Sequence, residues 1–308
     1  MRVAMIGLGD IARKAYLPAL AMRSDVELCL VTRDPATLAA LAADWRPARF
    51  GTDLDGQIRL GLDAAFVHAA TVAHEAIATR LLQAGIPTYV DKPLAADYAG
   101  AERLVELAER QGVSLMVGFN RRFAPAYAQM RAQPRDLIVM HKHRVNHPDV
   151  PRTAIFDDFI HVIDTLRFLL PGTLRDLYIT LGQSGGKLHH VTVTLLGEQD
   201  GATCTAIGVM NRLAGTSEEI LEVSGLDGDG RAIRHRSHQL GETWIAEHGD
   251  DRRQLPNDWT PVAMRRGIQQ ACDHFLCAVR AGQVLDARDS LLTHRICETI
   301  VQKATDDA

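Results

Sequence analysis

A glycine-containing turn near the start of the chain constrains the fold most strongly. The run Gly7-Leu8-Gly9-Asp10-Ile11-Ala12 directly follows a predicted strand and opens a predicted helix. In that context Gly7 permits a tight turn, Gly9 lets the backbone approach a pyrophosphate, and Ala12 still allows close packing of helix on sheet. The first helical residues, Asp10 to Ala12, offer free N–H groups to phosphates. The motif therefore predicts a dinucleotide site, with a plain strand-to-helix turn as the alternative.

The chain from Arg2 to about Asn120 alternates short apolar runs with amphipathic stretches. Little alternation within the apolar runs is typical of strands buried on both faces. A helix from Asp97 to Gly112 has a good capping residue at each end. The predicted strands are Val3–Ile6, Val26–Thr32, Ala64–His68, Thr88–Val90 and Ser114–Gly118. This rhythm predicts an α/β fold with a doubly wound parallel sheet.

The pattern changes after Asn120, where short strands follow one another across glycine-containing turns. The predicted strands are 137–145, 177–181, 190–196, 202–210 and 219–223, and the predicted helices are 156–170, 261–281 and 290–305. Successive short strands favour a mostly antiparallel sheet. We therefore expect a first domain over residues 1–120 and an α+β domain over residues 121–308.

Composition excludes several classes of protein. A net charge of −4 and a pI near 6.3 give no basic excess for nucleic acid. The N-terminus has too few apolar residues for a signal peptide, and no later stretch approaches the roughly 20 that a membrane span needs. The five cysteines are odd in number and form no CxxC pair, which favours a reducing cytoplasm. His141, His143 and His147 lack nearby carboxylates or thiolates to complete a metal site, so no metal is expected.

The end of the second predicted strand bears on the choice of cofactor. NAD-selective sites usually place an acidic residue there to bind the ribose 2′-hydroxyl. This chain has Thr32 and Arg33, which suit a 2′-phosphate because a guanidinium binds phosphate as a planar fork. The prediction is a preference for NADP over NAD, with Asp34 as the rival ribose ligand.

Lysine is rare in this chain, which has 29 arginines and five lysines. Lys92 stands in Asp91-Lys92-Pro93, directly after the strand Thr88–Val90, at the sheet edge where ligands bind in open α/β folds. An ammonium there can donate to a substrate oxygen and assist a proton transfer. The alternative is a solvated loop lysine. The Lys92–Pro93 peptide bond can be cis or trans.

The predicted helix 156–170 supplies a second polar cluster. Asp157, His161 and Asp164 are spaced i, i+4 and i+7 and so share one helical face. A carboxylate one turn from an imidazole can orient it for acid–base work near neutral pH. His161 is therefore the candidate proton acceptor or donor, and a structural histidine is the alternative.

Taken as a series, these motifs resemble the glucose-fructose oxidoreductase, inositol dehydrogenase and MocA (Gfo/Idh/MocA) family. The series is Gly7-x-Gly9-x-x-Ala12, Thr71-x-x-His74, Asp91-Lys92-Pro93-Leu94 and Asp157-x-x-x-His161-x-x-Asp164, in the family's order along nearly the whole chain. The runs 90–95, 118–125 and 157–164 most resemble the branch called MviM, or virulence factor.

The resemblance implies a Rossmann domain, an open-sheet α+β domain, and NAD(P)-dependent oxidation of a sugar or cyclitol hydroxyl. Lys92 would hydrogen-bond the reacting oxygen, His161 would exchange its proton, and Asp157 would orient substrate or histidine. The residues implied at the cofactor are Gly7, Gly9, Asp10, Ile11, Ala12, Thr32, Arg33, Thr71, His74, Asp91, Lys92 and Pro93. Those implied at the substrate are Lys92, Asn120, Arg121, Asp157, Asp158 and His161.

Three departures from the family pattern matter. Asp91 stands where glutamate is commoner, Thr32 replaces the usual acidic residue, and residues 151–156 lack the glycine-rich run that often precedes the helix. The first hypothesis is an oxidoreductase acting on a small polyol, assembled as a homodimer or homotetramer through the C-terminal sheet. The second is a non-catalytic NAD(P)-binding regulatory or sensor protein on the same fold.

Overall fold

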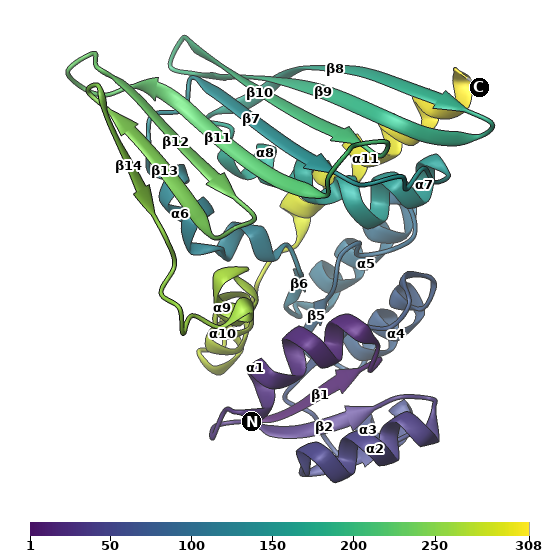
Figure 1. Cartoon of the computed structure of the whole chain (residues 1–308). Helices are drawn as coiled ribbons and strands as arrows, with labels where there is room; N and C mark the ends of the chain where they lie inside the picture. Colours follow the sequence, from purple (N-terminus) through teal and green to yellow (C-terminus); the bar gives the residue numbers. More distant parts are fainter. Residues whose placement is uncertain (308) are drawn as a thin grey trace. The chain divides into compact units, whose positions relative to one another are not determined.

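The computed structural model describes residues 1–307, which form two compact units (Figure 1). The first unit comprises Met1–Asn120 and Ile268–His294, and the second begins at Arg121, runs to Gly267 and resumes at Arg295. The chain thus returns to the first unit over residues 268–294.

The first unit is built on a six-stranded parallel sheet. Its strands are β1 (Arg2–Ile6), β2 (Glu27–Val31), β3 (Arg49–Gly51), β4 (Ala64–Val67), β5 (Thr88–Val90) and β6 (Leu115–Val117). Their order is β3-β2-β1-β4-β5-β6, so the direction of winding reverses between β1 and β4. The predicted doubly wound parallel sheet is confirmed, and only the short edge strand β3 was not expected.

Helices cover this sheet, and the two ends of one of them, α5 (Tyr98–Gln111), were predicted from the sequence. They are η1 (Ala12–Tyr16, a π-helical turn), α1 (Leu17–Ala21), α2 (Pro35–Trp45), α3 (Leu54–Arg59), α4 (Thr71–Gln83), α5 (Tyr98–Gln111) and α10 (Ile268–Arg280). The Asp97 carboxylate accepts a hydrogen bond from the N–H of Gly100 and caps α5. Gly112 ends α5 in the left-handed region, at φ 63°. Both predicted caps are confirmed.

An aromatic cluster explains why residues 268–294 belong to the first unit. Phe275 of α10 packs edge-on against Phe66 of β4 and Tyr89 of β5, with ring centroids 5.2 and 5.7 Å apart. The Tyr16 and Tyr89 hydroxyls, both buried, are hydrogen-bonded at 3.1 Å. Aromatic side chains contribute large buried areas to a core. Residues 268–294 therefore complete the core of the first unit.

The second unit contains an eight-stranded sheet. Its strands are β7 (Leu137–His143), β8 (Thr173–Ser184), β9 (Lys187–Gln199), β10 (Ala202–Asn211), β11 (Glu218–Leu226), β12 (Ala232–His238), β13 (Glu242–Glu247) and β14 (Asp250–Gln254). Their order is β14-β13-β12-β11-β7-β10-β9-β8, and every pair is antiparallel except β7 with β10. The mostly antiparallel sheet is confirmed.

Helices lie against one face of this sheet, where α8 packs on β7 and β10 (Figure 1). They are η2 (Asn120–Phe123), α6 (Pro125–Arg131), α7 (Pro151–Thr153), η3 (Ala154–Phe159, π-helical), α8 (Ile160–Leu169), α9 (Val262–Arg265) and α11 (Arg288–Asp306). The single helix expected over 261–281 is wrong: Gly267, at φ 76°, separates α9 from α10. None of the helices in residues 1–307 is long and apolar enough to cross a membrane.

Candidate functional site

A pocket of about 560 Å³ lies at the carboxyl ends of β1, β2 and β4. Gly7, Gly9, Thr32, Arg33 and Ala69 are among the residues that line it. Because the winding of the sheet reverses between β1 and β4, this is the edge where doubly wound folds bind dinucleotides. The pocket therefore lies where the glycine motif predicted a cofactor.

The two glycines of the motif serve different purposes. Gly7 has φ 84°, and a Cβ there would lie 2.4 Å from the N atom of Ala69, so only glycine fits. A Cβ on Gly9 would have nothing within 4 Å, because Gly9 faces open space. Gly7 is thus required by the fold, and Gly9 leaves room for a ligand. Asp10 and Ile11 are exposed beside this turn, and Ala12 is buried under it.

The residues that follow β2, Thr32 to Asp34, line the pocket and include the rival cofactor ligands that the sequence left open. Asp34 caps α2: its carboxylate accepts hydrogen bonds from the N–H of Ala36 at 3.1 Å and from the Thr37 hydroxyl at 2.5 Å. Thr32 and Arg33 line the pocket, half-exposed and exposed respectively. Both oxygens of Asp34 thus accept hydrogen bonds within the cap of α2.

The turn that carries Lys92 is anchored at three consecutive residues. The Lys92 N–H donates to the Asp91 carboxylate at 2.8 Å. The Pro93 carbonyl contacts Nδ1 of His74 at 2.8 Å, and the Leu94 N–H donates to Nε2 of His294 at 3.0 Å. The Lys92–Pro93 peptide bond is cis. This anchored turn holds the half-buried Lys92 at the carboxyl end of β5.

His74 joins two loops of the pocket edge. It lies on α4, which begins at Thr71, and its Nε2 contacts the Ala69 carbonyl at 2.9 Å while Nδ1 contacts the Pro93 carbonyl. Burial lowers the pKa of His74, although both carbonyls oppose this shift. A neutral ring has one N–H and donates to one carbonyl at a time. His74, which was expected at the cofactor, ties the Ala69 loop to the Lys92 turn.

His68 lies beside Asp91 and was not among the expected site residues. Its side chain is fully buried, its ring centroid is 4.0 Å from that of Tyr16, and Nδ1 is 3.8 Å from the Asp91 carboxylate. That separation is too long for a hydrogen bond, and neither ring nitrogen has a hydrogen-bond partner within residues 1–307. Burial raises the pKa of Asp91, but His68 and Lys92 outweigh it, and the pKa is lowered. Asp91 therefore stays ionised beside Lys92.

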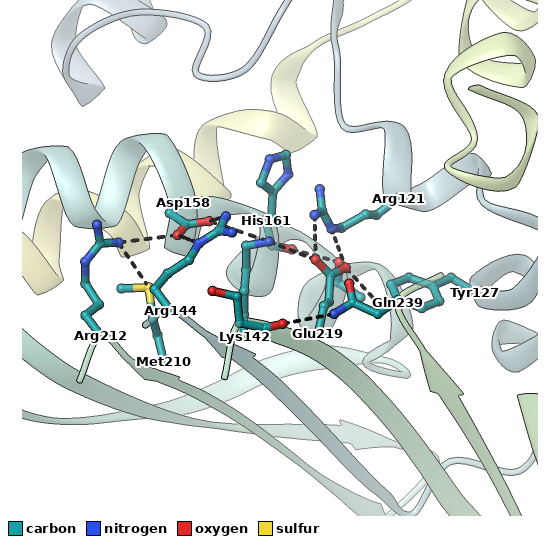
Figure 2. A network of polar contacts seen from close by, with 12 residues as sticks. Arg121, Tyr127, Lys142, Arg144, Asp158, His161, Met210, Arg212, Glu219 and Gln239 are labelled. Atoms are coloured by element: carbon teal, nitrogen blue, oxygen red, sulfur yellow. Dashed lines mark hydrogen bonds and ion pairs between the residues drawn. The ribbon is translucent and has the colours of Figure 1, made fainter. Parts of the chain in front are cut away.

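The second unit presents Asp157 and His161 on one helical segment. Asp157 lies in the π-helical turn η3 and is exposed, and His161, in the first turn of α8, is half-buried. Figure 2 shows the His161 ring pointing away from the strands. Asp164 is buried instead, and Arg122 donates to both of its carboxylate oxygens. The third member of the predicted polar face is therefore held within the unit by an ion pair.

A buried network of charges lies under this segment, between the helices and the sheet (Figure 2). Glu219 of β11 is one of its two centres. Its carboxylate accepts two hydrogen bonds from Arg121, at 2.8 and 2.7 Å, one from the Tyr127 hydroxyl and one from Lys142. Burial favours the neutral acid, but Arg121 and Lys142 outweigh it and hold the pKa of Glu219 well below its usual range.

Asp158 is the second centre and directly follows Asp157 in the chain. Arg144 donates to both carboxylate oxygens, at 2.7 and 2.8 Å, Arg212 donates to one at 3.3 Å, and the Lys142 ammonium lies 3.5 Å away. Burial favours the neutral acid here too, but these cations lower the pKa of Asp158 to about 2. Lys142 thus links the two centres.

Three residues that were expected at the substrate, Asn120, Arg121 and Asp158, are buried. Arg121 and Asp158 are held by the ion pairs just described. Lys142, Arg144 and Arg212 were not recognised, because they lie at the ends of β7 and β10, which are far apart in sequence and become neighbours only in the sheet. The scarcity of lysine was the one signal that could have indicated Lys142.

A second pocket, of about 480 Å³, opens above Asp158 within the second unit. We call it the Arg144 pocket. Arg144, His147, Asp149, Asp157, Arg212 and Ser217 are among its lining residues. Every residue of its lining except Val145 has a polar side chain, which suits a hydroxyl-rich molecule better than a flat apolar one.

Comparisons with known proteins agree with this architecture. Residues 1–119 match the family description "Oxidoreductase family, NAD-binding Rossmann fold", and residues 125–237 match "YceM-like, C-terminal domain". Among solved structures, a Gfo/Idh/MocA family oxidoreductase from Vibrio cholerae is 34% identical, with TM-score 0.88 over 100% of this chain and 99% of that one. The dehydrogenase MviM from Clostridium difficile is 28% identical, with TM-score 0.90 over 98% and 99%.

Relatives in sequence extend over both units. YceM of Salmonella typhimurium is 30% identical over 99% of this chain and 98% of its own length. The myo-inositol dehydrogenase Hyg17 of Streptomyces leeuwenhoekii is 31% identical over 91% of this chain and 86% of its own. The chain therefore belongs to the Gfo/Idh/MocA family of oxidoreductases and carries a C-terminal domain of the YceM type.

Proposed function

We propose that the protein transfers a hydride between NAD(P) and a secondary alcohol carbon of a sugar, cyclitol or related polyol. The observation that carries this proposal is the anchored Lys92 turn, one strand along the same sheet edge from the β1, β2 and β4 pocket. The name of the relative Hyg17, a myo-inositol dehydrogenase, supports the substrate class.

The proposed roles follow the chemistry of the side chains. The Lys92 ammonium donates a hydrogen bond to the reacting oxygen, and the ionised Asp91 beside it favours the charged form of the lysine. His161 accepts the hydroxyl proton during oxidation and returns it during reduction. Asp157 accepts a hydrogen bond from a substrate hydroxyl or from His161. The bound nicotinamide supplies the hydride exchange, and the protein supplies position and proton handling.

The test is substitution of Lys92 by methionine. We expect nicotinamide fluorescence titrations to give a nearly unchanged Kd for NADPH and turnover to fall by orders of magnitude, since the proton-handling group is lost. Lys187→Met is the matched control, because Lys187 is exposed at the start of β9. Unchanged turnover in Lys92→Met would refute the role. Nucleotide binding without turnover on a broad polyol panel would favour the sensor alternative.

We also propose that NADP is preferred over NAD. Thr32 and Arg33 are the pocket residues suited to a 2′-phosphate, while the Asp34 carboxylate is engaged in capping α2. The expected result is a lower Kd for NADPH than for NADH. Thr32→Asp should reverse this order, because a carboxylate repels the phosphate and binds the ribose hydroxyls. A wild-type preference for NADH would overturn the assignment.

Self-association through the eight-stranded sheet is the third part of the proposal. The residues that alternate with the buried ones on β7, β9 and β10 are mostly half-exposed, and Tyr178 on β8 is 58% exposed. An open face of this kind can be covered by a second copy. Light scattering should therefore report a homodimer or homotetramer, and a monomer at micromolar concentration would contradict it.

A further inference from the structure

The Arg144 pocket has hydrogen-bond donors that the protein does not use. Nε and Nη2 of Arg144 donate to Asp158, which leaves Nη1 without a partner in the part of the chain that the structure describes. Nε of Arg212 donates to the His147 carbonyl, and Nη1 contacts Asp158 and the Met210 sulfur. Nη2 of Arg212 has no hydrogen-bond partner among residues 1–307. Two guanidinium groups therefore have unused donors at one pocket.

Behind the pocket, the cations of the network outnumber its buried carboxylates. The network buries two carboxylates, Glu219 and Asp158, against four cations contributed by Arg121, Lys142, Arg144 and Arg212. Arg212 is itself only 2% exposed. A guanidinium N–H that is held away from water, as in Arg212, is unfavourable unless an acceptor approaches it. Asp158 already accepts from two arginines and cannot supply further acceptors.

Two further carboxylates, Asp149 and Asp157, line the pocket, so that four carboxylates face the four cations. Asp149 accepts a hydrogen bond from the N–H of Val150, and Asp157 is exposed. Carboxylates are the acceptors that sugar hydroxyls require. The pocket therefore combines donors for one oxyanion with acceptors for hydroxyl groups, and the same two carboxylates oppose a ligand with several negative charges.

We propose that the substrate is a polyol that carries one oxyanion group, a carboxylate or a phosphate, bound by Arg144 and Arg212. This inference rests on the proposed function, because it places the substrate of that reaction in the Arg144 pocket beside Asp157. A guanidinium binds either oxyanion in a bidentate manner, which makes Arg144 a specificity-determining residue. A neutral sugar offers these donors only hydroxyl oxygens, which accept weaker hydrogen bonds than a carboxylate or a phosphate does.

Binding of matched ligands tests the proposal without any need for turnover. Isothermal titration calorimetry would compare D-sorbitol, D-gluconate and D-sorbitol 6-phosphate, which share a six-carbon skeleton and differ in charge. Glycolate, an anion without a stereocentre, would be measured beside them. We expect at least one of the anions to bind about tenfold more tightly than sorbitol, because hydrogen bonds to charged groups are strong. The tighter of gluconate and sorbitol 6-phosphate identifies the oxyanion.

Variants locate the effect. Arg144→Gln should abolish the advantage of the anions, and Arg144→Lys, which keeps the charge, should retain part of it even if the glutamine variant folds poorly. Arg175→Gln is the matched control, since Arg175 pairs with Glu198 at 2.9 Å on the exposed strands β8 and β9. Equal affinities, a preference that survives in Arg144→Gln, or no binding of any anion would each overturn the proposal.

These experiments distinguish a failure of the oxyanion site from a failure of the proposed function. Anion binding that depends on Arg144, without oxidation of any polyol, would keep the oxyanion site and refute the oxidoreductase activity on polyols. Oxidation of neutral polyols without an anion advantage would keep that activity and refute the oxyanion site.

Discussion

The core of the first unit buries two neutral hydroxyls against each other, whereas the core of the second buries a network of charged side chains. Tyr16 and Tyr89 share one hydrogen bond within an aromatic cluster. Glu219 and Asp158 each bind several cations in the second unit. The pocket of the first unit is lined by residues such as Gly7, Gly9 and Ala69, and neither tyrosine is among them. In the second unit, the same ion pairs that stabilise the core also line the pocket.

Glu219→Gln should produce the largest loss of stability. The substitution leaves Arg121 and Lys142 without their shared carboxylate, and breaking a buried pair of this kind costs about 3–5 kcal/mol. Urea unfolding followed by circular dichroism measures the change. The control is Glu198→Gln, whose partner Arg175 is exposed and whose loss should cost less than about 1 kcal/mol. Equal losses in the two variants would remove the contrast between buried and exposed pairs.

Gly7→Ala tests the backbone-built site in the first unit. Its Cβ would approach Ala69 to 2.4 Å in a left-handed backbone conformation, so the stability should fall by about 2 kcal/mol or more. Gly9→Ala has open space around its Cβ and should leave the stability nearly unchanged while weakening NADPH binding. Denaturant unfolding and fluorescence titration separate the two effects. A stable Gly7→Ala would show that the turn can relax.

Acid should weaken the network of the second unit. The pKa of Asp158 is about 2 in the folded protein against an ordinary 3.8, a difference equivalent to about 2 kcal/mol of stability. Because the folded pKa is the lower one, this stabilisation is present above about pH 4 and is lost as the pH falls through 2. Asp158→Asn should therefore show a flatter dependence of unfolding free energy on pH over that interval. An unchanged slope would contradict the assignment.

Tyr16→Phe should have the smallest effect of the four. It leaves the Tyr89 hydroxyl buried without its partner, at a cost of about 1–2 kcal/mol, whereas Tyr16→Phe with Tyr89→Phe removes both polar groups and should recover much of that loss. A double-mutant cycle by urea unfolding measures the coupling. A double variant no more stable than Tyr16→Phe alone would contradict this expectation, because removing the second hydroxyl would then recover no stability.

The first unit was predictable because its signals are local. The Gly7 turn, the Asp97 and Gly112 caps and the unbroken apolar strands each depend on a few neighbouring residues. The charge network was not, because Lys142 and Glu219 become neighbours only through the register of β7 with β11. The return of residues 268–294 to the first unit also depends on tertiary packing, through Phe275. Sequence periodicity predicts which face of a helix is buried but not which partner covers it.

The path of the chain has a consequence for the order of events during biosynthesis. Phe275 packs on Phe66 and Tyr89, so the first unit lacks part of its core until α10 has been made. Residues 121–267, which belong to the second unit, are synthesised before residue 268. N-terminal domains commonly fold first as a chain emerges from the ribosome. In this protein the N-terminal sheet can complete its core only after the intervening unit has been synthesised.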